Sequence, residues 1–267
     1  MPELPEVQHV VNSLLPVIVG RRLTAISTGP HDVTEPRGFD LRLRLEGRRI
    51  ERVYRRAKRI VFQLDGDDRF YIHLGMSGTI IVCPRQSPVR PHTHLRADLD
   101  NQTELRFSDP RRFGGIFWMG RSFETENDLG PEPFDLCASD LLPRLATARV
   151  IKTALLDQSV IAGLGNIYVD ESLFAARIHP RQPARTLTLT QATSLLSSVK
   201  RILNRAIAAG GSSLRDYVDA AGNKGSFQNA HRVYDRAGKA CSRCRTPIER
   251  IVLHQRSTHF CPACQCL

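Results

Sequence analysis

Two pairs of cysteines near the end of the chain constrain its fold more than any other sequence feature. Each pair has the form Cys-x-x-Cys, and sixteen residues separate them. This spacing is typical of paired knuckles that hold one zinc ion in a tetrahedron of thiolates, and because protein atoms fill all four positions we expect a structural Zn2+. The expected ligands are Cys241, Cys244, Cys261 and Cys264. Between the pairs, residues 248–253 and 258–260 predict two strands of a hairpin, with a turn at 254–257 that presents Arg256.

The charge of the chain indicates a polyanionic partner. The 38 Lys and Arg residues outnumber the 27 Asp and Glu residues, which leaves a net charge of +11 at pH 7. Charge alone leaves nucleic acid, a membrane surface and the ribosome as alternatives. The densest basic run, residues 48–59, suits the neutralisation of phosphates because it carries seven basic residues and one acidic residue. No apolar run approaches the roughly 18 residues of a membrane helix and no signal-peptide pattern is present, so we expect a cytosolic protein.

The N-terminal half of the chain has the pattern of a β-rich domain. Leu41–Leu45 alternates Leu with Arg, which predicts a strand, and short apolar runs bounded by Gly, Asp or Pro predict others. These runs are 60–62, 70–72 and 80–82. Apolar residues at helical spacing between Val7 and Leu15 predict one preceding helix, with Pro5 in its first turn and Pro16 at its end. Successive strands beside one helix indicate a β-sandwich with a flanking helix.

The pattern changes to helical spacing after a Gly-Pro-Glu-Pro stretch. A capping box of Thr188 and Gln191 predicts the start of a long amphipathic helix, which Gly210–Gly211 should close. Residues 211–230 show little periodicity, which predicts a long mobile loop. We therefore expect three domains, 1–134, 135–230 and 231–267.

The N-terminus offers a candidate nucleophile. Removal of Met1 would leave Pro2 as a free secondary amine, and an α-amino group titrates near neutral pH, so part of it is already nucleophilic. Proline at this position is common and usually marks only processing. Glu3 and Glu6 would stabilise the N-terminus of a helix in any protein, but beside an amine Glu3 becomes a candidate proton shuttle. Other motifs must decide between these interpretations.

Six motifs occur in one order along the chain. The motifs are Pro2-Glu3-Leu4-Pro5-Glu6-Val7, Arg55-Arg56-Ala57-Lys58, His73-Leu74-Gly75-Met76-Ser77-Gly78, Asp109-Pro110-Arg111-Arg112-Phe113-Gly114, Gly165-Asn166-Ile167-Tyr168 and the zinc hairpin. Each motif is weak by itself, but together they resemble those of the formamidopyrimidine-DNA glycosylases, a bacterial family of DNA-repair enzymes. The resemblance runs from Pro2 to Cys264 and covers nearly the whole chain.

The resemblance implies an α+β multidomain fold: an N-terminal β-sandwich with a flanking helix, a helix-two-turns-helix domain and a zinc-finger hairpin, with DNA between the domains. It also implies a bifunctional glycosylase and lyase of base excision repair, acting on oxidised purines such as 8-oxoguanine and formamidopyrimidines. Separately, we expect a monomer. In this scheme Pro2 attacks C1′ of the lesion nucleotide, expels the base and forms a Schiff base. Glu3 protonates the sugar ring oxygen, and β,δ-elimination cuts the strand on both sides.

The resemblance further implies roles for residues outside the N-terminus. Lys58 and Arg256 join Pro2 and Glu3 in the catalytic group. The positions that grip phosphates around the flipped nucleotide are Lys58, His73, Asn166, Tyr234 and Arg256. Asn166 is expected to open a helix whose N-terminus favours a phosphate. The expected wedge, which fills the space left by the extruded base, consists of Met76, Arg111 and Phe113. Residues 211–230, including Arg215 and Phe227, resemble a lid over the lesion.

Two other functions are compatible with the same motifs. An endonuclease-VIII-like enzyme would share the fold and chemistry but prefer oxidised pyrimidines, although Leu4 and the long lid favour the purine enzyme. A noncatalytic zinc-ribbon DNA-binding protein would carry Pro2 incidentally. The chain departs from the family pattern at Gln8-His9 and in the lid at 223–227, so lesion preference is less determined by the sequence than reaction type.

Overall fold

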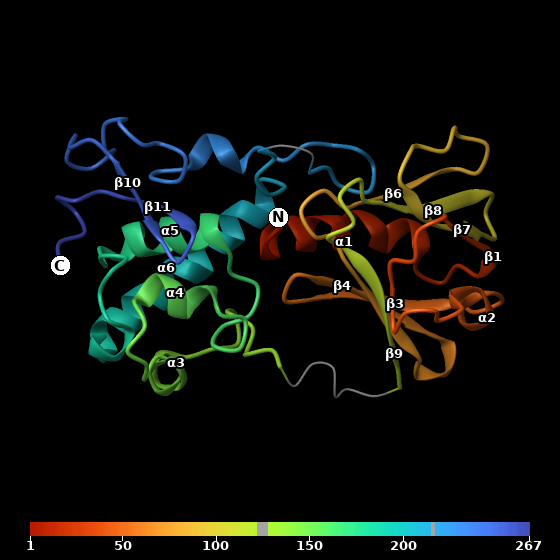
Figure 1. Cartoon of the computed structure of the whole chain (residues 1–267), viewed down its shortest axis with the longest axis horizontal. Helices are drawn as coiled ribbons and strands as arrows, with labels where there is room; N and C mark the ends of the chain where they lie inside the picture. Colours follow the sequence, from red (N-terminus) through yellow and green to blue (C-terminus); the bar gives the residue numbers. More distant parts are fainter. Residues whose placement is uncertain (122–127, 215–216) are drawn as a thin grey trace. The chain divides into compact units, whose positions relative to one another are not determined.

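The computed structural model describes residues 1–121, 128–214 and 217–267 (Figure 1). The chain divides into two compact units. The first contains Met1–Glu126 and Ala209–Ser226, and the second contains Asn127–Ala208 and Phe227–Leu267. Within the residues described, no helix has both the length and the apolar character to cross a membrane.

The first unit begins with helix α1, Leu4–Ile18, which starts at a capping box formed by Glu3 and Glu6. Pro5 lies in the first turn as predicted. The prediction that Pro16 ends the helix is wrong, because Pro16 lies inside it and the helix continues to Ile18. A proline inside a helix removes one backbone hydrogen bond and costs about 3 kcal/mol. Ile18 is completely buried, and burial of its side chain stabilises the fold by about 1.5–3 kcal/mol, which offsets much of this cost.

Two sheets form the rest of the first unit. One sheet has the strand order β1-β7-β8-β6, and the other has the order β2-β9-β5-β4-β3, in which only the β2–β9 pair is parallel. The strands are β1 Leu23–Thr28, β2 Thr34–Glu35, β3 Ile50–Arg56, β4 Arg59–Leu64, β5 Arg69–His73, β6 Thr79–Pro84, β7 Thr93–Leu99, β8 Thr103–Ser108 and β9 Gly115–Gly120. Buried side chains from α1 and from both sheets form one core, which confirms the expected sandwich with a flanking helix.

The prediction of a strand at Leu41–Leu45 is wrong, because this segment is the short helix α2. The carboxylate of Asp40 accepts a hydrogen bond from the backbone N–H of Arg42 at 2.9 Å and caps the helix. Leu41 and Leu45 lie one turn apart and are both buried, whereas Leu43 is 79% exposed. An alternating strand would place Leu41 and Leu45 on one face, and so would one turn of a helix. A five-residue pattern does not distinguish the two structures.

The second unit contains the remaining helices and one hairpin. Its elements are α3 Ala138–Arg144, α4 Ile151–Leu156, α5 Asn166–Ala176, the 3-10 turn η3 Ala184–Thr186, α6 Leu189–Ala208, the 3-10 turn η4 Phe227–Ala230, β10 Glu249–Leu253 and β11 Arg256–Phe260. The capping box before α6 is confirmed, because the backbone N–H of Gln191 donates to Thr188 Oγ1 at 3.2 Å and Thr188 N–H donates to Gln191 Oε1 at 3.1 Å. Gly210 and Gly211 follow the helix with positive φ, as its expected end requires.

The two units divide the chain differently from the three expected domains. Residues 209–226 belong to the first unit, where the backbone N–H of Ser212 donates to Glu6 Oε1 at 2.7 Å. The zinc hairpin shares the second unit with the helices, and Lys152 Nζ donates to the carbonyl of Ser257 at 2.8 Å. Contacts between segments that are distant in sequence therefore define the two compact units, whereas the three expected domains were based on local composition.

The hairpin β10–β11 has a tighter turn than the sequence predicts. Leu253 pairs with Arg256, so only His254 and Gln255 form the turn, both with positive φ. A two-residue turn of this kind matches the twist of the flanking strands. Arg256 consequently begins β11 instead of lying within the turn.

Candidate functional site

The N-terminus of α1 is buried and anchored. Pro2, Glu3 and Glu6 are all buried, and the backbone N–H of Glu3 donates to Glu6 Oε2 at 2.9 Å. The hydroxyl of Tyr217 donates to the carbonyl of Glu6 at 3.0 Å, and Glu6 Oε1 accepts from Ser212. Glu6 therefore fixes the first helical turn to Ser212 and Tyr217. This arrangement holds the chain end and the Glu3 carboxylate in defined positions.

The electrostatic environment of the chain end favours an uncharged amine. Burial is the largest cause that lowers the pKa of the Met1 amino group below its usual value of 8.0, and the charges of Lys58 and Arg111 lower this pKa further. Glu3 and Glu6 act in the opposite direction. Lys58 is buried in the two-residue turn between β3 and β4. An amine in this position is thus more often unprotonated, and more nucleophilic, than an exposed one.

His73, at the end of β5, lies in the same basic environment. Burial and then the charges of Lys58 and Arg59 lower the pKa of His73 to about 4, so its imidazole is neutral at pH 7. The backbone N–H of Gly75 donates to His73 Nδ1 at 3.2 Å. A neutral imidazole that accepts at Nδ1 carries its proton on Nε2, and it can therefore donate one hydrogen bond to a phosphate oxygen.

The turns that carry the expected wedge residues share one buried carboxylate, that of Asp109. Asp109 accepts hydrogen bonds from Ser77 Oγ at 2.5 Å and from the backbone N–H groups of Gly114 at 2.7 Å and Arg111 at 3.3 Å. Arg111 Nε also donates to Ser77 Oγ at 3.2 Å. Asp109 therefore ties the 74–78 turn to the 109–114 turn.

The same two turns approach each other too closely for larger residues. A Cβ atom on Gly75, which has a φ of +59°, would lie 2.4 Å from the backbone nitrogen of Gly114. On this rigid base, Met76 is 42% exposed and Phe113 is 63% exposed, and the guanidinium of Arg111 lies 5.8 Å from the Phe113 ring centre. Exposed apolar side chains on a fixed backbone can enter a base stack without first losing much conformational entropy.

In the second unit, one carbonyl connects the helices to the hairpin. Asn166, at the first residue of α5 as predicted, donates through Nδ2 to the carbonyl of Ser257 at 2.9 Å. Lys152 Nζ donates to the same carbonyl and to Asp170 Oδ1 at 2.7 Å, and Asp170 Oδ2 accepts from the backbone N–H of His259 at 2.9 Å. These contacts hold the residues that flank the exposed Arg256.

Tyr234 lies in a segment held by another buried carboxylate. Glu171 accepts hydrogen bonds from the backbone N–H groups of Arg232, Val233 and Tyr234 at 2.8–3.0 Å. Burial raises the pKa of Glu171, while these three donors oppose that effect. The ring of Tyr234 lies 5.1 Å from the ring of His259, so the segment also contacts the hairpin.

Of the two expected lid residues, the structure describes only Phe227. Arg215 lies outside the described residues. Phe227 begins η4 and is buried within the second unit, with its ring 5.9 Å from Tyr168 and 5.8 Å from His231. Phe227, near one end of the expected lid, therefore packs against the rings of Tyr168 and His231 in this conformation.

The four expected zinc ligands converge. Their sulfur atoms all lie within 4.8 Å of one another, and Sγ–Sγ distances include 3.4 Å for Cys244–Cys261 and 3.9 Å for Cys241–Cys264. A zinc–sulfur bond of about 2.3 Å places the sulfurs of a tetrahedron about 3.8 Å apart. The donor set and its geometry fit one structural zinc, and the exposed Cys266 is not part of this cluster.

Several buried carboxylates that organise the site were not predicted from the sequence. Asp109, Asp170 and Glu171 each accept hydrogen bonds that fix a segment with an expected DNA contact. Asp109 opens a recognised motif, which is the one signal that could have drawn attention to it. Asp170 and Glu171 lie in an unremarkable helical segment, and the backbone N–H groups that they accept from are 61–89 residues away.

These features together define a two-unit α+β protein, in which a β-sandwich carries a buried N-terminal site and a helical unit carries a four-cysteine metal site. Family models agree along the chain. Residues 1–116 match the formamidopyrimidine-DNA glycosylase N-terminal domain, residues 129–218 match the H2TH domain of the same enzymes, and residues 238–265 match the zinc finger found in FPG and IleRS.

Full-length relatives agree with the family models. The chain is 45% identical over 273 residues to the formamidopyrimidine-DNA glycosylase of Laribacter hongkongensis, covering 99% of this chain and 100% of the relative. The enzyme of Chloroflexus aurantiacus is 44% identical over 272 residues, with coverage of 99% and 98%. The chain therefore belongs to the formamidopyrimidine-DNA glycosylase family, as the motifs predicted.

Solved structures of the family have the same fold. A Lactococcus lactis FPG mutant in complex with DNA containing Fapy-dG has a TM-score of 0.93 at 35% identity, with full coverage of both chains. The Lactococcus lactis Fpg bound to abasic-site DNA has a TM-score of 0.92 at 34% identity, covering 99% of this chain and 100% of that chain. MutM from Thermus thermophilus has a TM-score of 0.87 at 39% identity, with coverage of 99% and 98%.

Proposed function

We propose that this protein is a DNA glycosylase of base excision repair that removes oxidised purines from duplex DNA and then cuts the strand as a lyase. Family membership supports the glycosylase activity. The observation that carries the finer proposal is the buried start of α1, where Pro2 lies beside Glu3 and where burial and nearby positive charge lower the pKa of the adjoining Met1 amine.

The proposed reaction begins after Met1 is removed. The nitrogen of Pro2 forms a bond to C1′ of the lesion nucleotide and gives up its proton, and the glycosidic bond breaks so that the base leaves with its bonding electrons and takes up a proton. Glu3 donates a proton to the sugar ring oxygen as the C1′–O4′ bond opens, which leaves an iminium between Pro2 and C1′. Proton loss from C2′ then expels the 3′ phosphate, and a second elimination expels the 5′ phosphate.

Binding of the extruded nucleotide is assigned to residues of both units. We propose that Lys58, His73, Asn166, Tyr234 and Arg256 contact phosphates, with His73 donating as a neutral imidazole. The proposed wedge of Met76, Arg111 and Phe113 fills the vacated position in the duplex. Residues 211–230, including Arg215 and Phe227, are the proposed lid over the lesion.

Borohydride trapping tests the reaction. Purified protein whose intact mass shows loss of Met1 is incubated with a duplex containing one 8-oxoguanine, and borohydride reduces any Schiff base to a stable adduct. We expect one covalent adduct per protein, located by peptide mass at Pro2. A protein that retains Met1 is the matched control and should give no adduct at Pro2, because the Pro2 nitrogen is then part of a peptide bond. Failure of the processed protein to form an adduct with any oxidised base would refute the enzymatic proposal and favour a noncatalytic DNA-binding protein.

The same assay distinguishes the purine enzyme from an endonuclease-VIII-like enzyme. Duplexes that carry one oxidised pyrimidine replace the 8-oxoguanine duplex under single-turnover conditions. We expect faster trapping on the oxidised purine. Faster trapping on the pyrimidine would leave the chemistry of Pro2 intact but overturn the proposed substrate class.

A further inference from the structure

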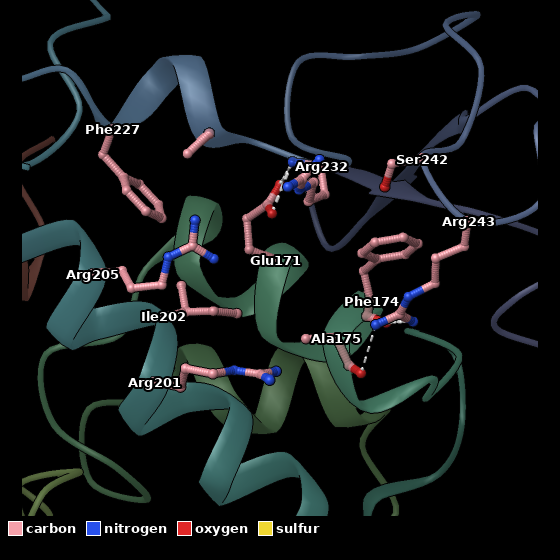
Figure 2. A pocket seen from close by; sticks show the side chains of 11 residues that line it. Glu171, Phe174, Ala175, Arg201, Ile202, Arg205, Phe227, Arg232, Ser242 and Arg243 are labelled. Atoms are coloured by element: carbon pink, nitrogen blue, oxygen red, sulfur yellow. Dashed lines mark hydrogen bonds between the residues drawn. The ribbon is translucent and has the colours of Figure 1, made fainter.

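A pocket of about 360 Å³ opens in the second unit at the C-terminal end of α5 (Figure 2). Side chains from α5, α6, η4 and the first zinc knuckle line it, so helices and zinc finger both contribute to its wall. Phe174 and Ile202 are buried and form an apolar surface within it, and Phe227 adds its ring at one edge. The volume lies in the range of pockets that bind small groups.

The wall of this pocket carries three exposed arginines, Arg201, Arg205 and Arg232. In the part of the chain that the structure describes, none of the three forms an ion pair. Figure 2 shows Arg201 and Arg205 extending from neighbouring turns of α6 into the pocket, with Arg232 beyond Glu171. Exposed arginines around a concavity attract anionic groups.

The other charged groups of the pocket already have partners. Arg243 donates to the carbonyls of Phe174 and Ala175 at 2.8 and 3.1 Å and lies over the Phe174 ring. Glu171 accepts hydrogen bonds from the three backbone N–H groups described above, and the N–H of Arg232 contacts both of its carboxylate oxygens. Its carboxylate is therefore engaged with the backbone, and the three exposed arginines determine the charge that the pocket presents to a ligand.

The pocket is separate from the proposed phosphate contact on α5. Asn166 lies at the first residue of that helix, whereas Phe174 lies eight residues later, which corresponds to about 12 Å along the axis at 1.5 Å per residue. Arg201, Arg205 and Phe174 have no role in the proposed reaction. Phe227, at one edge of the pocket, is shared with the proposed lid, whereas the three arginines and Phe174 are distinct from the residues assigned to the lesion.

We propose that this pocket binds an acidic peptide segment of a protein partner, with one aromatic or aliphatic side chain of the peptide on the apolar surface and flanking carboxylates on the three arginines. Duplex DNA fits these observations less well, because its convex backbone presents phosphates but no apolar group to fill a concavity. Arginine around an apolar centre is also the composition typical of protein–protein binding sites.

Calorimetric titration of the full-length, zinc-loaded protein with the capped peptide Glu-Asp-Phe-Glu-Asp tests the proposal. We expect saturable binding that weakens with added salt. Arg205→Glu should weaken it by at least about tenfold, because it places a carboxylate where the peptide needs a cation. The matched control is Arg185→Glu, which makes the same charge change at an exposed arginine on η3 outside the pocket and should alter the affinity less than about twofold.

Two further measurements test the concave surface. Ala175→Trp should abolish peptide binding by filling the pocket without changing its charge, and the peptide Glu-Asp-Ala-Glu-Asp should bind more weakly than the Phe peptide. Zinc content and borohydride trapping confirm that each variant is folded.

The proposal is overturned by absence of binding at millimolar peptide, by equal effects of Arg205→Glu and Arg185→Glu, or by equal affinity for the two peptides. Selective loss of undamaged-DNA affinity in Arg205→Glu, with peptide binding unchanged, would assign the arginines to DNA instead.

Discussion

Substitution of Lys152 tests whether a buried ion pair holds the zinc hairpin against the helices. The Lys152 ammonium and the Asp170 carboxylate are 2.7 Å apart and both side chains are at most 1% exposed. The ammonium also donates to the carbonyl of Ser257, one residue after Arg256. Lys152→Met retains a long apolar side chain but removes the charge, so Asp170 is left as a buried carboxylate without its cation.

The expected loss of stability follows from the burial of this pair. Removing one partner of a buried ion pair costs about 3–5 kcal/mol, because the remaining charge has lost both its partner and its hydration. The matched control is Arg149→Met, since Arg149 and Asp157 are at a similar distance of 2.8 Å but are 41% and 31% exposed. Solvent screens this pair, so its loss should cost less than about 1 kcal/mol.

Urea unfolding followed by two signals separates the two units. The single tryptophan, Trp118, belongs to the first unit and reports its unfolding by fluorescence. Far-ultraviolet circular dichroism reports mainly the helices of the second unit. For an m-value of about 2 kcal/mol/M, Lys152→Met should lower the dichroism midpoint by about 1.5–2.5 M and leave the tryptophan midpoint nearly unchanged. Equal midpoint shifts in Lys152→Met and Arg149→Met would refute the assignment of the buried pair as the principal tie.

Two other substitutions probe the proposed active site and the zinc. Lys58→Ala should weaken binding to lesion and undamaged DNA alike and flatten the slope of log affinity against log salt by about one. The charge of Lys58 lowers the pKa of the Met1 amine. If it acts in the same direction on the Pro2 amine that removal of Met1 exposes, Lys58→Ala should reduce the unprotonated fraction of that amine at neutral pH and move the trapping-rate profile to higher pH. Cys244→Ser should release zinc and abolish DNA binding while Trp118 fluorescence shows that the first unit stays folded.

Each of these predictions has an outcome that contradicts it. An unchanged salt slope in Lys58→Ala would remove Lys58 from the phosphate contacts, and an unchanged pH profile would remove it from the environment of the amine. Metal analysis and DNA titration of Cys266→Ser provide the control for Cys244→Ser, because Cys266 is an exposed thiol outside the four-sulfur cluster. Retained DNA affinity in metal-free Cys244→Ser protein would show that the hairpin does not depend on zinc for its role.

Local patterns predicted the parts of the fold that local interactions build. The capping box of Thr188 and Gln191 marks the start of α6 because its hydrogen bonds span only three residues. The knuckle spacing of the cysteines predicts a tetrahedral cluster because the ion imposes its own geometry on any chain that supplies four thiolates. Leu41–Leu45 shows the limit of this approach, since one short apolar pattern fits both a strand and a helix until burial selects between them.

The sequence by itself determined the family, the zinc ligands and the identity of the candidate nucleophile, because these depend on residue types at fixed spacing. Only the tertiary structure decided which groups position them. Asp109 meets Ser77 across 32 residues, and Lys152 meets Ser257 across 105. The lowered pKa of the terminal amine likewise depends on burial and on Lys58, which is distant in sequence. These polar groups are buried with their partners only after the chain has folded. Because the partners are far apart in sequence, no local sequence pattern predicts such pairs.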